Sequence, residues 1–248
     1  MQHLNHLSKS QQESVLSLIK AAHDFDGTPA IAEHVLLHLR HGGDKSDSHL
    51  VIEENKEVIA YAHLDTTDLV AGPSVEAVVH PQHRGKGLGV LILKEAIKIC
   101  GDKTRIWSHG DLPAAKAIAA SLKLERLWSN LLMSKFLGEI QPVTSKYPIR
   151  TFIPGLDNQA FLALNNKVFA DYPDQGGWSE DDLKVRLNED WFEKEGFFVA
   201  EDEGQLIGFC WTKIHGAHTH SHDGGDDDHG HDALGEIYVL AVNPDYKG

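Results

Sequence analysis

The 248-residue sequence contains only two cysteines, Cys100 and Cys210, which lie far apart and outside any C-x-x-C spacing. This scarcity argues against a disulfide framework and against a zinc site built on cysteine. The sequence also lacks an apolar run of about 18 residues, so no segment is expected to span a membrane. The N-terminal residues lack the basic start and apolar core of a signal peptide, and we therefore expect a cytoplasmic protein.

Positive charge is also scarce, because 23 Lys and Arg residues stand against 37 Asp and Glu residues and give a net charge of -14. Nucleic-acid binding draws most of its affinity from basic side chains that neutralise phosphates, so we expect no nucleic-acid partner. A hydrophobic content of 41% and a charged content of 24% are typical of a globular protein. The length suits two domains of ordinary size.

The sequence contains two copies of one pattern. Residues 50–64 align without a gap with residues 198–212, and both stretches predict a hairpin with a polar turn. Residues 77–85 align with residues 240–248, and each stretch is a short strand followed by x-Pro. The two alignments have different offsets, and the difference falls on a His/Asp-rich stretch at 215–233. We interpret this stretch as a loop inserted into the second copy.

The pattern predicts an α/β protein with two tandem units. Expected helices cover 10–22, 30–41, 87–99, 111–122, 157–169 and 179–189. Expected strands cover 75–79, 104–108, 124–136 and 235–242, besides the hairpins at 49–64 and 197–212. Asp111 is expected to cap its helix, with Pro113 in the first turn. The expected domains are 1–138 and 148–248, with a linker at 139–147 and a second unit truncated after its central strand.

A glycine-rich turn follows the strand at 75–79. Gly85, Gly87 and Gly89 allow a tight bend and a close approach of the backbone to a ligand. The helix after them offers free N–H groups and the positive end of its dipole to a pyrophosphate, and Arg84 and Lys86 add positive charge. The spacing is not the Rossmann G-x-G-x-x-G, and no P-loop G-K-[ST] is present. The alternative is a glycine turn with no ligand.

The pattern Arg84-x-x-Gly87-x-Gly89 after V-x-x-x-V-x-P resembles the acetyl-CoA signature of the GNAT acetyltransferases. The resemblance implies the GNAT fold, an α+β form of the α/β class, with acetyl-CoA as co-substrate and no metal. In that family the strand splays from its neighbour, its free edge pairs with the pantetheine, and the turn holds the pyrophosphate. The implied acetyl-CoA contacts are Ala77, Val78, Val79, Gly85, Lys86, Gly87, Leu88, Gly89, Val90, Leu240, Ala241, Val242, Lys247 and Gly248.

Several further stretches resemble tandem GNAT enzymes of mycothiol biosynthesis. They are residues 77–89, 107–124, 165–179, 209–215 and 235–248, and the most distinctive segment is PDQGGW at 173–178. This resemblance implies acetylation of the cysteinyl amine of a cysteine–glucosamine–inositol conjugate, a small thiol-sugar, by a monomeric enzyme. The substrate contacts implied by position are Glu33, Asp174, Lys213 and Glu236. A polyol with an amine needs carboxylates and a cation as hydrogen-bond partners, which these residues supply.

The resemblance also implies catalytic roles for the second unit. The substrate amine must lose a proton before it attacks the thioester, and Glu236 is the candidate general base, acting through a water. A backbone N–H near Leu240–Val242 would polarise the thioester carbonyl. The family's general acid is a tyrosine late in the second copy, past the point where this sequence ends, so that role is assigned to no residue, including Tyr238.

Each assignment has a structural alternative. Glu33 would then be a solvated helix residue, Asp174 a turn residue, Lys213 an exposed strand lysine and Glu236 a strand carboxylate without a chemical role. His109 is interpreted as supporting the turn before a helix. The stretch 215–233 carries six histidines and five aspartates, which suit zinc, nickel or copper. Such tracts are usually solvated loops, and we expect no physiological metal there.

Two other functions stay open at the level of sequence. One is a non-catalytic acetyl-CoA-binding protein, because the intact glycine turn belongs to the first copy. The other is a tandem GNAT enzyme that acetylates a different amine, such as an aminoglycoside or a protein N-terminus. Weak or no transferase activity is expected if the protein ends at Gly248, whereas the enzyme interpretation stands if the sequence is part of a longer protein.

Overall fold

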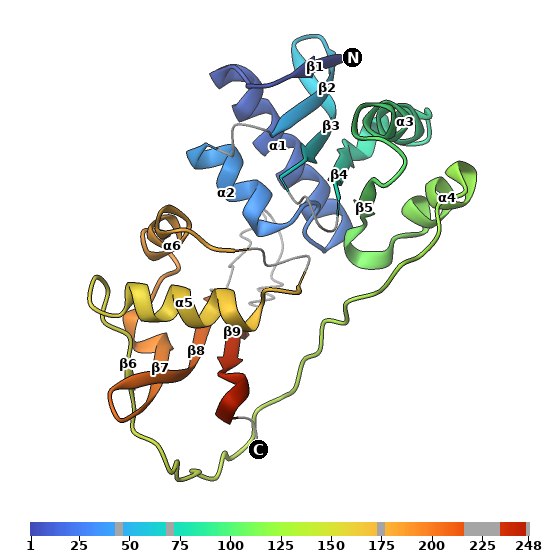
Figure 1. The fold of residues 1–248 in the computed structure, drawn as a ribbon. Helices are drawn as coiled ribbons and strands as arrows, with labels where there is room; N and C mark the ends of the chain where they lie inside the picture. Colours follow the sequence, from blue (N-terminus) through green and yellow to red (C-terminus); the bar gives the residue numbers. More distant parts are fainter. Residues whose placement is uncertain (43–46, 68–71, 173–176, 216–233, 247–248) are drawn as a thin grey trace, which may run out of the picture. The chain divides into compact units, whose positions relative to one another are not determined.

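The computed structural model describes residues 1–42, 47–67, 72–172, 177–215 and 234–246. The chain divides into two compact units, Met1–Ser134 and Lys135–Gly248, and each unit carries its own sheet (Figure 1). No helix in these ranges is long and apolar enough to cross a membrane. The structure thus has the predicted α/β class and two units, while the exact domain boundaries at 138 and 148 stay a prediction.

The first unit is built on a five-stranded sheet with the strand order β1-β2-β3-β4-β5. Its strands are β1 (Gln2–Leu4), β2 (Ser48–Glu54), β3 (Glu57–Asp65), β4 (Ser74–Val79) and β5 (Arg105–Trp107). Neighbouring strands pair antiparallel, except that β4 and β5 are parallel. β3 is buried along nearly its whole length, because helices cover both faces of the sheet.

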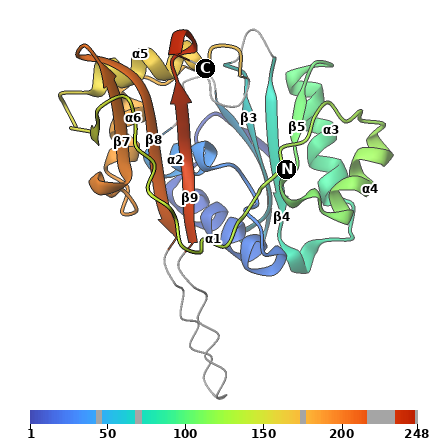
Figure 2. The ribbon, with the colours of Figure 1, turned by 90° about the horizontal axis from the view of Figure 1, so that it is seen from below.

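The helices of the first unit are α1 (Lys9–Asp26), α2 (Glu33–His41), α3 (Leu88–Cys100) and α4 (Pro113–Leu122). α1 and α2 lie on one face of the sheet, and α3 and α4 lie on the other (Figure 2). Ser8 begins α1 with a capping box that it forms with Gln11. Two apolar cores result, one around Val15 and Tyr61 and the other around Leu64 and Ile92.

The second unit has a four-stranded antiparallel sheet with the order β6-β7-β8-β9. Its elements are β6 (Ile149–Thr151), α5 (Asn158–Val168), α6 (Glu180–Leu187), β7 (Phe197–Asp202), β8 (Gln205–His215) and β9 (Leu234–Val242). The core between the sheet and its helices is aromatic. Phe197 lies between Trp211 and Phe152, with ring centroids 4.3 and 4.1 Å away, and Phe161 meets it edge-on.

The two units share a β-bulge at the same position of their hairpins. β2 pairs with β3 and β7 pairs with β8 through hairpins whose register shifts at the same aligned position, which leaves Ile59 and Ile207 as the extra residues. The carbonyl of Ile59 accepts a hydrogen bond from His80 N at 2.9 Å, and that of Ile207 accepts one from Asn243 N at 2.8 Å. The repeat inferred from the sequence is therefore confirmed in atomic detail.

Two local predictions are wrong. Residues 124–136 form no strand, and the described chain pairs no strand with them. A single extended segment has no ladder to satisfy its backbone, so its apolar side chains are not enough to make a strand. Asp111 does not cap α4: Leu112 occupies that position, and Asp111 has a positive φ of 48° and pairs with Lys116. The short strands β1 and β6 were not predicted at all.

Candidate active site

The free edge of β4 is the first element of the site. β4 pairs in parallel with β5 only over Ser74–Glu76, because β5 ends at Trp107 and the chain turns away. Beyond Glu76, no described strand pairs with that side of Ala77, Val78 and Val79, while β3 pairs with all three on the other side. The pairing of the two parallel strands therefore ends at this point, and on this side the backbone of Ala77–Val79 faces no described strand.

The glycine turn connects the end of β4 to α3 and has the geometry that a phosphate site needs. Gly85 and Gly87 have φ values of 74° and 80°, and Gly87 is the N-cap of α3. Leu88, Gly89 and Val90 form the first turn of α3, whose backbone N–H groups have no partner within the helix. Gly89 has a different role: a Cβ there would lie 2.7 Å from Ile118 Cδ1, so this glycine lets α4 pack closely.

Arg84 does not offer the free charge that the sequence suggested. Its guanidinium donates two hydrogen bonds of 2.7 Å to the Asp26 carboxylate, and its Nε donates to the Val79 carbonyl at 3.0 Å. The bidentate pair neutralises the arginine and ties the turn to the end of α1. Lys86 remains as an exposed cation of the turn.

A buried carboxylate–imidazole pair lies where β4 and β5 separate, and the sequence analysis missed it. Glu76 Oε2 accepts a hydrogen bond from Ala32 N at 2.6 Å and lies 3.0 Å from His109 Nε2. Burial works to raise the pKa of Glu76, but the hydrogen bond and the charge of His109, with the contact from Ala32, lower it overall. His109 therefore contacts a buried carboxylate besides supporting the turn. The residues on either side of it, Ser108 and Gly110, gave no sign of this partner in the sequence.

Glu33 is placed by the same contact. It is the first residue of α2, directly after Ala32, whose N–H is held by Glu76. A carboxylate in the first turn of a helix is stabilised by the helix dipole. The side chain is half-buried.

Lys213 and Glu236 are brought together by the register of the second sheet. They lie directly opposite each other on β8 and β9, although 23 positions separate them in the sequence. The Glu236 carboxylate also lies 2.7 Å from His215 Nε2. The structure thus joins two of the predicted substrate residues into one polar patch, which we call the β8–β9 patch (Lys213, His215 and Glu236).

Aromatic rings border the β8–β9 patch. The Lys213 ammonium lies 4.4 Å from the centroid of Trp191 and 5.6 Å from that of Tyr238. Tyr238 is the extra residue of a bulge in β9, and its hydroxyl accepts a hydrogen bond from Arg186 Nε at 3.1 Å. Arg186 in turn lies 4.1 Å from the Trp178 ring. Trp191 and Arg186 were missed because neither stands in a recognisable motif.

The outer edge of β9 is the counterpart of the free edge of β4. β9 is the last strand of its sheet within the described residues, and its Leu240 and Val242 side chains are exposed while Ala241 is buried. Leu240–Val242 form the C-terminal end of β9, and Glu236 lies near the start of the same strand. Asp174, Lys247 and Gly248 lie outside the described residues, as does the predicted loop insertion at 215–233 except for His215, which ends β8.

Chemically, the first unit offers a free strand edge and a glycine turn, and the second unit offers a carboxylate, a cation and aromatic rings. The edge can pair with an amide-bearing chain, and the turn can bind an anionic group. A half-exposed carboxylate can accept a proton from an amine, and the aromatic rings and the lysine can bind a hydroxyl-rich ligand.

Comparisons with known proteins agree with this chemistry. The model of the acetyltransferase (GNAT) family matches residues 14–124 and 162–248. A mycothiol acetyltransferase of Acidothermus cellulolyticus is 43% identical over 240 residues, which are 94% of this chain and 73% of that protein. Another, from Thermobispora bispora, is 40% identical over 246 residues, which are 96% of this chain and 77% of that protein.

Solved structures agree on the fold. A tandem GNAT protein from the clavulanic acid biosynthesis pathway superposes with a TM-score of 0.60 at 14% sequence identity, and the match covers 100% of this chain and 80% of that chain.

Proposed function

The chain belongs to the GNAT acetyltransferase family, and on that premise we propose that it transfers an acetyl group from acetyl-CoA to the cysteinyl amine of the mycothiol precursor. Two relatives that are 43% and 40% identical are mycothiol acetyltransferases, and the chain covers about three quarters of their length. The product is an amide, and the reaction is an acyl transfer in mycothiol biosynthesis. The acceptor is the small thiol-sugar cysteinyl–glucosaminyl–inositol.

We assign acetyl-CoA to two sets of residues. In the first unit the free edge of Ala77–Val79 would pair with the pantetheine, and the backbone of Gly85–Val90 would hold the pyrophosphate with help from Lys86. The positive φ values at Gly85 and Gly87 support this assignment, because they direct the chain into the helix N-terminus without a side chain in the way. In the second unit we assign the same role to Leu240–Val242 and to Lys247 and Gly248.

The observation that carries the catalytic proposal is the pairing of Lys213 with Glu236 beside the aromatic rings. Glu236 would accept a proton from the substrate amine through a water, which leaves a neutral nucleophile. Lys213, Asp174 and Glu33 would hold hydroxyl groups of the sugar and inositol. A backbone N–H at Leu240–Val242 would hold the carbonyl oxygen as negative charge develops on it.

The transfer needs no metal in this proposal, because a thioester is already activated and the proton goes to a carboxylate. We propose a monomer that works in the cytoplasm, where the substrate thiol stays reduced. The net charge of -14 supports a small-molecule partner over a nucleic acid.

Calorimetry with acetyl-CoA, followed by CoA release after the cysteinyl–glucosaminyl–inositol substrate is added, tests the proposal on the full chain. We expect binding and substrate-dependent release. E236Q should lower kcat by about 10²–10⁴-fold with little change in acetyl-CoA affinity, as expected for a lost general base. E203Q, in the exposed turn of the β7–β8 hairpin, is the matched control and should change neither value.

The other outcomes separate the rival functions. Binding without release would favour a non-catalytic acetyl-CoA-binding protein. Release with an aminoglycoside or a peptide N-terminus, and none with the thiol-sugar, would move the activity to another amine. A folded protein that does not bind acetyl-CoA would overturn the assignment of the glycine turn.

A further inference from the structure

Three potential metal ligands meet inside the first unit, away from the glycine turn. His38 Nδ1 lies 3.0 Å from Asp47 Oδ2, and His63 Nε2 lies 3.9 Å from the same oxygen. One ligand atom from each of the three residues lies within 4.8 Å of the other two. No motif in the sequence links these positions.

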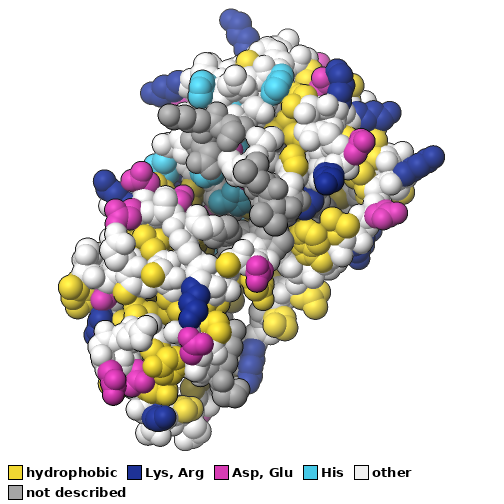
Figure 3. Space-filling view, in the orientation of Figure 1, with side chains coloured by type: hydrophobic (Ala, Val, Ile, Leu, Met, Phe, Trp, Pro, Cys, Tyr) yellow, Lys and Arg dark blue, Asp and Glu magenta, His cyan; other side chains and the backbone are white. Residues whose placement is uncertain are grey.

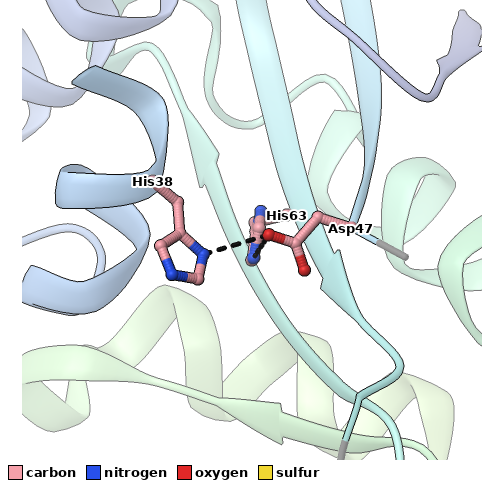
Figure 4. Close-up of side chains that lie close together, drawn as sticks. All are labelled: His38, Asp47 and His63. Carbon is pink, nitrogen blue, oxygen red and sulfur yellow. Dashed lines mark hydrogen bonds and ion pairs between the residues drawn. The ribbon is translucent and has the colours of Figure 1, made fainter. Parts of the chain in front are cut away.

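Three separate elements bring the side chains together (Figure 4). His38 comes from α2, Asp47 comes just before β2, and His63 comes from β3, and in the close-up one carboxylate oxygen of Asp47 points toward the two rings. α2 packs on the face of the sheet from which His63 projects, so the cluster joins a helix to the sheet beneath it. Asp47 and His63 are buried, while His38 is partly exposed.

His63 is an unusual core residue. Both of its ring nitrogens are buried, and neither forms a hydrogen bond to any residue that the structure describes. Burial, as the largest cause, lowers the pKa of His63, although Asp47 acts in the opposite direction. A neutral imidazole with an uncommitted lone pair is the form that binds a metal.

We propose that His38, Asp47 and His63 bind a zinc ion, with a water molecule in the fourth position. Two imidazole nitrogens and one carboxylate oxygen match the donors that Zn²⁺ takes, whereas Ca²⁺ and Mg²⁺ prefer oxygen alone. Ligand atoms of one tetrahedral Zn²⁺ lie roughly 3.3 Å apart, given bonds of about 2.0–2.1 Å. The 3.0 Å contact is close to this spacing, and side-chain rotation of His63 and Asp47 on metal binding would have to close the wider distances.

The site would fix α2 at a second point. Glu76 already holds the start of this helix through Ala32 N, and His63 lies opposite Glu76 in the pairing of β3 with β4. A zinc ion at His38 would hold the other half of the helix to β3, through His63, and to the start of β2, through Asp47. The partly exposed His38 gives the ion a path from solvent, and Figure 3 shows histidine side chains reaching the surface of this unit. The site is structural and takes no part in acetyl transfer.

Zinc binding can be measured directly on the full chain, purified without a histidine tag. Because the stretch 215–233 carries histidines of its own, the background protein replaces His218, His220, His222, His229 and His231 by Asn. After chelator treatment and addition of one equivalent of Zn²⁺, gel filtration and elemental analysis should find close to one zinc per chain. Co²⁺ should give the visible absorption of a four-coordinate site.

H38A and D47N should each weaken Zn²⁺ binding at least tenfold and abolish the Co²⁺ band, whereas H41A, on the same helix but exposed, should leave both unchanged. Hydrogen exchange in α2 should slow on addition of Zn²⁺ only in proteins that keep the three ligands, which separates binding from a folding defect. The proposal is overturned if the background protein retains no zinc, or if H38A and D47N retain it as well as H41A does.

Discussion

Replacement of Arg84 by Ala tests whether the arginine of the glycine turn is a structural tie or a phosphate ligand. Arg84 makes a bidentate contact with Asp26, and the exposed fractions of the two side chains are 28% and 9%. Asp26 is the last residue of α1, where the negative end of the helix dipole disfavours a carboxylate. R84A would therefore leave a poorly solvated negative charge without its partner.

The expected cost follows from these contacts. Loss of one partner from a buried ion pair costs about 3–5 kcal/mol, and partial exposure of Arg84 reduces this to about 2 kcal/mol. The lost hydrogen bond to the Val79 carbonyl adds about 1 kcal/mol. A total of about 3 kcal/mol corresponds to a roughly 100-fold increase in the opening of the first unit.

Native-state hydrogen exchange of the amides in β4 and α3, measured without acetyl-CoA, reports this change on the first unit alone. The matched control is K20A, which removes the Lys20–Asp24 pair from the same helix. Those side chains are 75% and 53% exposed, so the control should cost less than about 0.5 kcal/mol. If R84A without ligand costs no more than K20A but weakens acetyl-CoA binding, the structural role is wrong and Arg84 acts as a charge for the phosphates.

Three further predictions concern the core, acid stability and the turn. W211A should cost about 3–5 kcal/mol in urea unfolding of the second unit, since the indole is fully buried among aromatic rings, and a cost below 1 kcal/mol would contradict that packing. The folded state lowers the pKa of Glu76, so its stabilising contribution is present above the ordinary value of 4.5 and is lost as the pH falls through the folded pKa; E76Q should flatten this acid dependence in thermal melts. G87A should cost roughly 1–2 kcal/mol, because φ is 80° there, and should weaken acetyl-CoA binding in calorimetry, while unchanged stability would refute the strained turn.

The elements that could be predicted from the sequence are those whose pattern is contained in a short stretch of residues. The hairpin at 49–64 and the helix at 87–99 were predicted within a few residues, because apolar periodicity and turn residues are visible in a short window. The strand at 124–136 failed for the opposite reason. Its apolar residues are visible in a short window, but a strand exists only if another strand pairs with it, and no local pattern identifies that partner.

The site shows the same limit. Lys213 and Glu236 were predicted one by one from resemblance, but their adjacency depends on the β8–β9 register. The bulge at Tyr238, which faces it toward Trp191 and Lys213, changes the alternation by one residue and could not be read from the sequence. The cluster of His38, Asp47 and His63 was missed because packing of a helix on a sheet creates it, and no fixed spacing encodes such a contact.

The extra isoleucine of each hairpin fixes the position at which the turn after the central strand begins, whatever residues form that turn. The carbonyls of Ile59 and Ile207 bind the first N–H after the central strand, at His80 and Asn243. The hairpin, which aligns without a gap in the two copies, thus sets the point of departure. The residues beyond that point can therefore differ between the copies, His80-Pro81-Gln82 in one and Asn243-Pro244-Asp245 in the other, while the strand end that precedes them keeps the same contact.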